Sequence, residues 1–235
     1  MPASTRSLVL TAAAVAALCA AAGAAHAGVH RHLLGYSLDG RPIVAYELGD
    51  PASARRVLVV GCVHGNEPAG TAVTTALARR TPPAGVDLWV VPSFNPDGQA
   101  ADTRGNARGV DLNRNFPWRW RPLAGVYYSG PRALSEPESR IMDALLLRLH
   151  PAISIWFHQH LNVVDVSEGN VALERRFAKL VGSRTAVLAR EPGSIVTWEN
   201  HVFPRGSAFV VELPAGQLAA APALRFARAI DAIAR

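Results

Sequence analysis

Short apolar runs alternate with longer amphipathic segments along the chain, and this alternation predicts the order of its strands and helices. Buried strands are continuous apolar runs of about four to eight residues, whereas helices are longer and repeat their apolar positions every three or four residues. By this criterion the first part of the chain contains strands over residues 42–48, 56–62 and 86–91 and a helix over residues 68–80. Strands that alternate with helices in this way are typical of an α/β sheet covered by helices.

The second part of the chain continues the alternation after an irregular stretch of about 40 residues that ends at Pro131. The predicted elements are two strands, over residues 153–157 and 208–211, and three helices, over residues 135–150, 172–181 and 222–233. Ser135 can cap the first of these helices, and Pro222 suits the first position of the last one. An irregular stretch of this length is uncommon in a compact domain, so we expect it to carry functional residues.

The length and the N-terminus bound the domain organisation. The chain has 235 residues, of which 49% are apolar, and this is enough for one domain with a sizeable core. An alanine-rich run over residues 8–25 follows Arg6, and the tripeptide AHA at residues 25–27 matches the small-x-small pattern of a signal peptidase site. We therefore predict a signal peptide over residues 1–27 and one domain over residues 28–235, secreted or located in the periplasm or cell envelope. An uncleaved membrane anchor is the alternative, because the run is near the lower length limit for a span.

The net charge limits the possible binding partners, and the cysteine content limits the possible disulfides. The chain carries 24 Lys and Arg residues against 18 Asp and Glu residues, a formal net charge of +6. This excess suits an anionic envelope surface, but no basic stripe interleaved with aromatic residues indicates a nucleic-acid partner. Cleavage after residue 27 would remove Cys19 and leave Cys62 as the only thiol. An internal disulfide is therefore not expected, and the domain must be stabilised by its core.

A histidine and a glutamate follow one of the predicted buried strands. The segment GCVHGNE carries His64 and Glu67 three residues apart, at the sheet edge where α/β sites form, so the pair can share one divalent cation. Catalytic zinc takes three protein ligands and leaves a position for water. In the segment SIWFHQH, His158 directly follows an apolar run and is the predicted third ligand, with His160 as the alternative. The HxxE spacing alone is a weak signal, because structural histidines also follow strands.

Five motifs strengthen this interpretation, because together they resemble the zinc carboxypeptidase family: HGNE, NPDG, RGVDLNRNFP, WFHQ and FVVELP. They fall between residues 57 and 214, and the short length and the ELP ending are most similar to the murein peptide amidase branch. The resemblance implies a single α/β domain with a mixed, twisted sheet of roughly eight strands and helices on both faces. It also implies one zinc ion per chain and hydrolysis of the γ-D-glutamyl to meso-diaminopimelate bond of peptidoglycan peptides.

The resemblance implies roles for individual residues beside the three metal ligands. Glu212 would be the general base that takes a proton from the attacking water and later delivers it to the leaving amine. Arg104 would polarise the scissile carbonyl and stabilise the oxyanion, with Arg108 as the alternative in a shifted register. Asn113 and Arg114 would bind the free carboxylate of the substrate, since a guanidinium can donate two parallel hydrogen bonds to it.

Other residues near the motifs have open interpretations. Asp111 is expected to brace the loop or a metal-binding histidine. Residues 187–198 lack the tyrosine that closes over the substrate in digestive members of the family, so the substrate pocket cannot be inferred from those enzymes. Four residues of this segment are candidates for the pocket and equally for core or loop surface: Arg190, Ile195, Val196 and Trp198.

The predicted function is that of a secreted, monomeric zinc metallopeptidase that acts on peptidoglycan stem peptides and binds neither nucleic acid nor membrane after export. Two alternatives are a general extracellular carboxypeptidase on ordinary peptides and an N-acyl amino acid deacylase. A non-catalytic envelope-binding module is least expected, because a binding protein does not need the base at Glu212.

Overall fold

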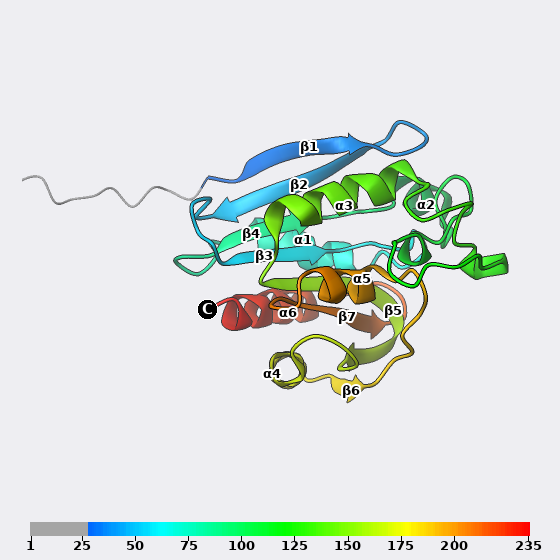
Figure 1. Ribbon diagram of the computed structural model, residues 1–235. Helices are drawn as coiled ribbons and strands as arrows, with labels where there is room; N and C mark the ends of the chain where they lie inside the picture. The colour runs from blue at the N-terminus through cyan, green and yellow to red at the C-terminus, as the bar shows by residue number, and fades with distance from the viewer. Residues whose placement is uncertain (1–27) are drawn as a thin grey trace, which may run out of the picture.

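The structure is a computed structural model of the chain, and it describes residues 28–235 (Figure 1). The predicted signal peptide, residues 1–27, lies outside the described residues. In the described part, seven strands and six α-helices form an α/β domain, together with two short 3-10 turns. None of the helices in residues 28–235 is long and apolar enough to cross a membrane.

The bounds of the elements agree broadly with the predicted alternation. The strands are β1 (His30–Tyr36), β2 (Pro42–Gly49), β3 (Arg56–Val60), β4 (Asp87–Val91), β5 (Ile153–Asp165), β6 (Arg184–Ala186) and β7 (Ser207–Pro214). The helices are α1 (Gly70–Ala78), α2 (Pro96–Ala101), α3 (Pro137–Leu149), α4 (Val171–Val181), α5 (Ile195–Val202) and α6 (Ala220–Ile233). The 3-10 turns are η1 (Leu112–Arg114) and η2 (Gly125–Tyr127).

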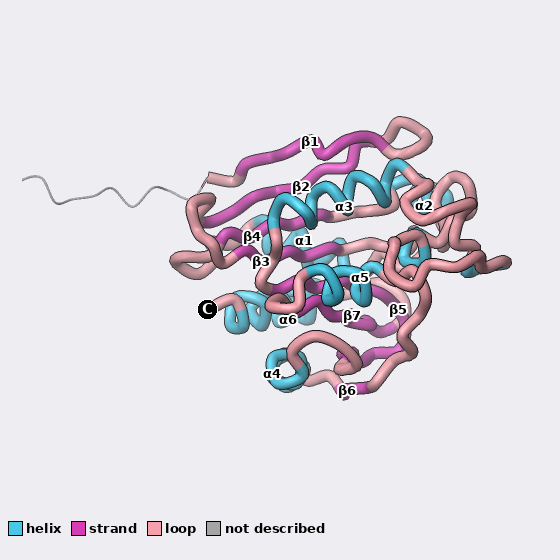
Figure 2. Tube along the Cα trace, viewed as in Figure 1, coloured by secondary structure: helices cyan, strands magenta, loops and turns pink. Residues whose placement is uncertain are grey.

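The strands form one mixed sheet in the order β1-β2-β4-β3-β5-β6, and β7 also pairs with β5. β1 and β4 pair antiparallel with β2, whereas β3 pairs in parallel with β4 and β5, and β5 pairs in parallel with β6 and β7. The prediction of a mixed sheet with helices on both faces is confirmed, with seven strands in the described part rather than about eight. Figure 2 shows the sheet running through the molecule between its helices.

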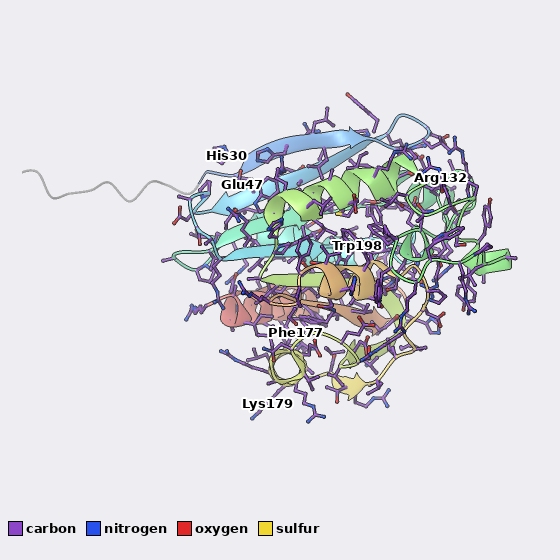
Figure 3. The ribbon with its side chains drawn as sticks, in the orientation of Figure 1. His30, Glu47, Arg132, Phe177, Lys179 and Trp198 are labelled. Carbon is purple, nitrogen blue, oxygen red and sulfur yellow. The ribbon has the colours of Figure 1, made fainter. Side chains whose placement is uncertain are left out.

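Each face of the sheet carries an apolar core. One core packs α1, α4 and α6 against the sheet, and the other packs α3 and α5. Consecutive residues of a strand point to opposite faces, so Trp156 of β5 lies in the second core and Phe157 lies in the first. The first half of β5 is buried on both faces of the sheet, which explains why it is a nearly continuous apolar run. The helices have one buried and one exposed side, and Figure 3 shows this on α4, where Phe177 points inward and Lys179 points to solvent.

β5 is longer than the sequence pattern predicts. The predicted strand ends at residue 157, but β5 continues to Asp165. The apolar pattern stops early because the residues from Gln159 to Asn162 are partly or fully exposed, and apolar residues resume at Val163. The polar middle of β5 therefore belongs to the strand and faces the candidate site described below.

Several element boundaries also differ from the predictions. Glu136, not Ser135, is the N-cap of α3, because Pro137 takes the first helical position. α6 begins at Ala220, so Pro222 is its third residue. Four elements have no counterpart in the predictions, namely β1, β6, α2 and α5. β1 and β6 are exposed or half-buried along their length, so they carry no apolar run for the pattern to detect.

A buried glutamate that links α5 to β5 should make stability depend on pH. Glu199 accepts hydrogen bonds from Ser154 Oγ and Trp156 Nε1, and burial raises its pKa from 4.5 to about 7. Because the folded state binds this proton more tightly, the stabilisation is complete below about pH 4.5 and is lost as the pH rises through about 7. We expect the free energy of unfolding to fall by on the order of 3 kcal/mol across this window.

The measurement is urea unfolding of the wild type and the Glu199→Gln variant at a series of pH values from 4.5 to 8. Since the variant cannot release this proton, its free energy of unfolding should depend less on pH than that of the wild type. Identical pH dependence in the two proteins would contradict the assignment of this titration to Glu199.

Candidate active site

One loop and one strand bring three metal-binding side chains together at the C-terminal edge of the parallel strands. His64 and Glu67 lie between β3 and α1, and His158 lies in β5. Glu67 Oε2 lies 2.9 Å from His64 Nδ1 and 3.0 Å from His158 Nδ1, and the two Nδ1 atoms are 3.1 Å apart. These three residues form a group that could hold a metal ion. His160 lies outside this group and is exposed, so the structure favours His158 over His160.

Asp111 orients His64 through the ring nitrogen that does not face the metal-binding group. Its Oδ1 lies 3.0 Å from His64 Nε2 and also accepts a hydrogen bond from the backbone N–H of Asn113. Although burial opposes the ionisation of Asp111, the charges of His64, Arg104 and Arg114 hold its pKa well below its usual range. A carboxylate on Nε2 leaves Nδ1 of His64 as the metal-binding nitrogen. The predicted bracing role of Asp111 therefore has a geometric basis.

The HGNE and NPDG motifs lie in direct contact, which explains their joint occurrence. A Cβ atom on Gly65 would lie 1.9 Å from the backbone carbon of Gly98, so only glycine fits between the two loops. Asn95 caps α2 by accepting a hydrogen bond from the backbone of Gly98. The NPDG motif is therefore the start of a short helix that holds the metal-binding loop in place.

The proposed base and the proposed oxyanion residue line the same cavity, whose volume is about 310 Å³. Glu212 of β7 is the register partner of His158 on the neighbouring strand, so parallel pairing places it beside the metal group. Arg104 donates to Glu67 Oε1 at 3.2 Å and contacts Asp111 Oδ2 at 2.9 Å. Arg108 instead pairs with Glu136 at 3.4 Å and is not among the residues that line the cavity.

The two residues predicted to bind a carboxylate also line the cavity. Asn113 Oδ1 accepts from the backbone N–H of Ile195, which leaves the amide group of its side chain free to donate. Arg114 is 7% exposed and donates from Nη1 to the backbone oxygen of Asn113. Its Nε has no hydrogen-bond partner in residues 28–235. Because Arg114 lines the cavity and makes only one side-chain hydrogen bond within residues 28–235, its guanidinium has N–H groups left to bind an anion.

Of the four candidate pocket residues in residues 187–198, one lines the cavity. Val196 does so, whereas Ile195 and Trp198 belong to the apolar core between α5 and the sheet. Arg190 donates to the backbone oxygen of Ser167 and lies 3.7 Å from Glu168. Cys62, beside the metal-binding loop, is buried, and burial raises the pKa of its thiol to about 12, so it is not a reactive nucleophile.

Several polar residues of the cavity were not identified from the sequence, and three of them bear on substrate binding. Asp165 and Glu168 lie at and just beyond the end of β5, and Glu168 accepts a hydrogen bond from Thr197. Tyr127 of η2 is the third. Neither a motif nor an apolar pattern indicated these positions, because they meet the metal group only through the tertiary fold.

The fold and this arrangement of side chains define a zinc-dependent metallo-hydrolase. A sequence profile of the zinc carboxypeptidase family matches residues 15–165, and the chain belongs to that family. The matched residues end before Glu212, so the position of that residue depends on the pairing of β7 with β5. Two imidazole nitrogens and one carboxylate oxygen are the donor set that catalytic zinc takes, and the His64, Glu67 and His158 group fits it.

Comparison with individual proteins shows which members of the family are similar to this chain. Murein peptide amidase A of Escherichia coli K12 is 33% identical over 183 residues, which cover 70% of this chain and 74% of the relative. The crystal structure of the murein-tripeptide amidase of Escherichia coli O157 has a TM-score of 0.72 at 25% identity, covering 87% of this chain and 91% of that one. Carboxypeptidase A of Helicoverpa armigera has a TM-score of 0.71 at 18% identity, covering 88% and 69%, and shows the same fold.

Proposed function

We propose that this protein is an exported zinc peptidase that hydrolyses the γ-D-glutamyl to meso-diaminopimelate bond of peptidoglycan peptides. The observation that carries the proposal is the buried Arg114, whose side chain makes one hydrogen bond within residues 28–235 and which lines the same cavity as the His64, Glu67 and His158 group. A guanidinium that binds the free terminal carboxylate of a peptide would place the last amide bond of that peptide beside the metal-binding group. An enzyme with this arrangement cleaves near a chain end. The similarity to murein peptide amidase A supports the choice of peptide.

Each residue then has a defined task. Arg114 and the amide group of Asn113 hold the free carboxylate of the substrate, which fixes the scissile bond in the cavity. Glu212 takes the proton of the attacking water and passes it to the leaving amine. Arg104 stabilises the negative charge that develops on the scissile carbonyl oxygen.

His64, Glu67 and His158 are the proposed zinc ligands, and Asp111 holds His64 in the required orientation. When bound, zinc supplies Lewis acidity that polarises the carbonyl and makes water a nucleophile at neutral pH. The cavity restricts the position of the substrate through the residues from β5, β7 and the long loop that line it.

The acidic lining of the cavity favours diaminopimelate over an apolar residue. Asp165 and Glu168 face the same space as Arg114 and Asn113. The side chain of diaminopimelate ends in both an ammonium and a carboxylate group, so it can meet carboxylate and guanidinium partners together. An apolar side chain would desolvate these carboxylates without placing a cation beside them, which is unfavourable.

Export is part of the proposal, because peptidoglycan peptides lie outside the cytoplasm when they are attached to the wall. The alanine-rich run and the AHA tripeptide of residues 1–27 support a signal peptide. We further propose that the mature protein acts as a monomer, since the three metal-binding residues and the residues that line the cavity come from one chain.

Mass spectrometry of the products tests the proposed substrate. Purified protein loaded with zinc is incubated with L-Ala-γ-D-Glu-meso-diaminopimelate, with ordinary C-terminal peptides, and with an N-acyl amino acid. We expect release of diaminopimelate from the tripeptide and much slower hydrolysis of the others. An amidated tripeptide, which lacks the free carboxylate next to the scissile bond, should be a poor substrate because Arg114 has no anion to bind.

The other substrates distinguish the alternatives. Preferential trimming of ordinary peptides would identify a general carboxypeptidase and contradict the peptidoglycan assignment. Release of the acyl group alone would identify a deacylase. Equal hydrolysis of the free and amidated tripeptides would show that the terminal carboxylate is not recognised.

A further inference from the structure

An aromatic ring contacts both arginines of the cavity. The Cζ atom of Arg104 lies 5.2 Å from the centroid of the Tyr127 ring, and the Cζ atom of Arg114 lies 5.3 Å from it. Both distances are within the range of cation–π attraction. Tyr127 ends the 3-10 turn η2, in the long loop between α2 and α3 that lies beyond the C-terminal ends of the parallel strands (Figure 1). No other residue of the described chain has two guanidinium groups against its ring.

The two arginines differ in how much other support they have. Arg104 is held by two carboxylates, through Glu67 Oε1 and Asp111 Oδ2. Within residues 28–235, the only hydrogen bond from the Arg114 side chain goes to the backbone oxygen of Asn113. The ring of Tyr127 is therefore a second contact of the Arg114 guanidinium, and it can restrain the orientation of the guanidinium plane. This plane decides whether two parallel hydrogen bonds can reach a carboxylate.

The ring, and not the hydroxyl, makes these contacts. The hydroxyl of Tyr127 has no hydrogen-bond partner in the described part of the chain, and the side chain is half-exposed at the cavity. Phenylalanine has a similar π face and would keep the attraction to the guanidinium groups. The loop over residues 187–198 contains no tyrosine, so Tyr127 supplies an aromatic side chain to this cavity from a different part of the chain.

We propose that Tyr127 is a positioning residue, whose ring holds the guanidinium of Arg114, and to a lesser extent that of Arg104, in the orientation that receives the substrate carboxylate. This inference rests on the proposed function, because it takes Arg114 as the carboxylate-binding residue. The ring of Tyr127 then affects the binding of the substrate carboxylate. Loss of the ring should therefore raise KM more than it lowers kcat.

Anion binding without turnover tests the inference. The zinc-loaded wild type and three variants, Tyr127→Ala, Tyr127→Phe and Tyr128→Ala, are titrated with succinate as a carboxylate probe. Tyr128 is the matched control, because it is the neighbouring tyrosine and is not among the described residues that line the cavity. We expect Tyr127→Ala to bind succinate about 5- to 30-fold more weakly, whereas Tyr127→Phe and Tyr128→Ala bind it as the wild type does.

A nuclear magnetic resonance signal reports the contact directly. The ring current of Tyr127 should shift the Nε–H proton resonance of Arg114, and the shift should persist in Tyr127→Phe and vanish in Tyr127→Ala. Wild-type affinity in Tyr127→Ala, or equal losses in Tyr127→Phe and Tyr127→Ala, would overturn the inference.

The two proposals can fail separately, because neither the titration nor the resonance requires hydrolysis. If the wild type binds succinate through Arg114 but does not cleave the tripeptide, the proposed substrate is wrong and the role of Tyr127 stands. If the tripeptide is cleaved, KM and kcat of the variants complete the test. A fall in kcat with unchanged KM in Tyr127→Ala would assign the ring to the transition state and contradict its role in binding the carboxylate.

Discussion

Replacing Glu212 by glutamine should lower kcat by about 10² to 10⁴-fold, because the amide cannot accept the proton of the attacking water. The change removes one ionisable group and keeps the size and shape of the side chain. Glu212 is not part of the metal-binding group, so the variant should retain the zinc content of the wild type. KM should change little, because the residues proposed to bind the substrate carboxylate are Arg114 and Asn113, not Glu212.

The measurement is steady-state kinetics on the tripeptide together with zinc analysis of the purified variant. Glu191→Gln is a matched control, since Glu191 also lines the cavity and is separate from the metal-binding group. The control should retain wild-type kcat. A Glu212→Gln enzyme that keeps its zinc and its kcat would contradict the role of Glu212 as base.

Replacing His158 by alanine should remove both zinc and activity. His158 Nδ1 lies 3.1 Å from His64 Nδ1 and 3.0 Å from Glu67 Oε2, so the change takes one of three donors from the group. Two remaining donors hold zinc much more weakly than three. Loss of the metal removes several kcal/mol of transition-state stabilisation, and we expect kcat/KM to fall by on the order of 10³-fold or more.

The control for His158→Ala is His160→Ala, which lies two residues along the same strand and also lines the cavity. Zinc content after dialysis, measured by elemental mass spectrometry, should remain at about one ion per chain in His160→Ala and fall well below that in His158→Ala. Loss of zinc in His160→Ala with retention in His158→Ala would reverse the assignment of the third ligand.

Much of the fold follows from local patterns in the sequence. The central strands β3 and β4 and the first half of β5 are buried on both faces, so each appears as a continuous apolar run. The exposed edge strand β1 has no such run and was not predicted. The length of β5 was underestimated for a related reason, because its polar residues face the cavity.

In the candidate site, too, some residues were predicted from the sequence and others were assigned only by the structure. His64, Glu67 and His158 were predicted as a group because the two histidines follow apolar runs and Glu67 lies three residues after His64. Parallel strands place such positions at one edge of a sheet. Arg104 and Arg108 have the same residue type and lie in the same loop, and the sequence left both open. The structure separates them, because Arg104 reaches Glu67 whereas Arg108 pairs with Glu136 outside the cavity.

The sequence by itself determined the order of the buried strands and of the helices α1, α3, α4 and α6, and it supplied the set of metal-binding and ionisable residues. These depend on residue type and on spacing along the chain. The tertiary structure alone decided which residues share the cavity. Glu212 lies beside His158 through strand pairing, and Tyr127 lies against Arg114 through the path of a long loop. Contacts between residues far apart in the chain leave no periodic signal in the sequence, so they appear only when the chain is folded.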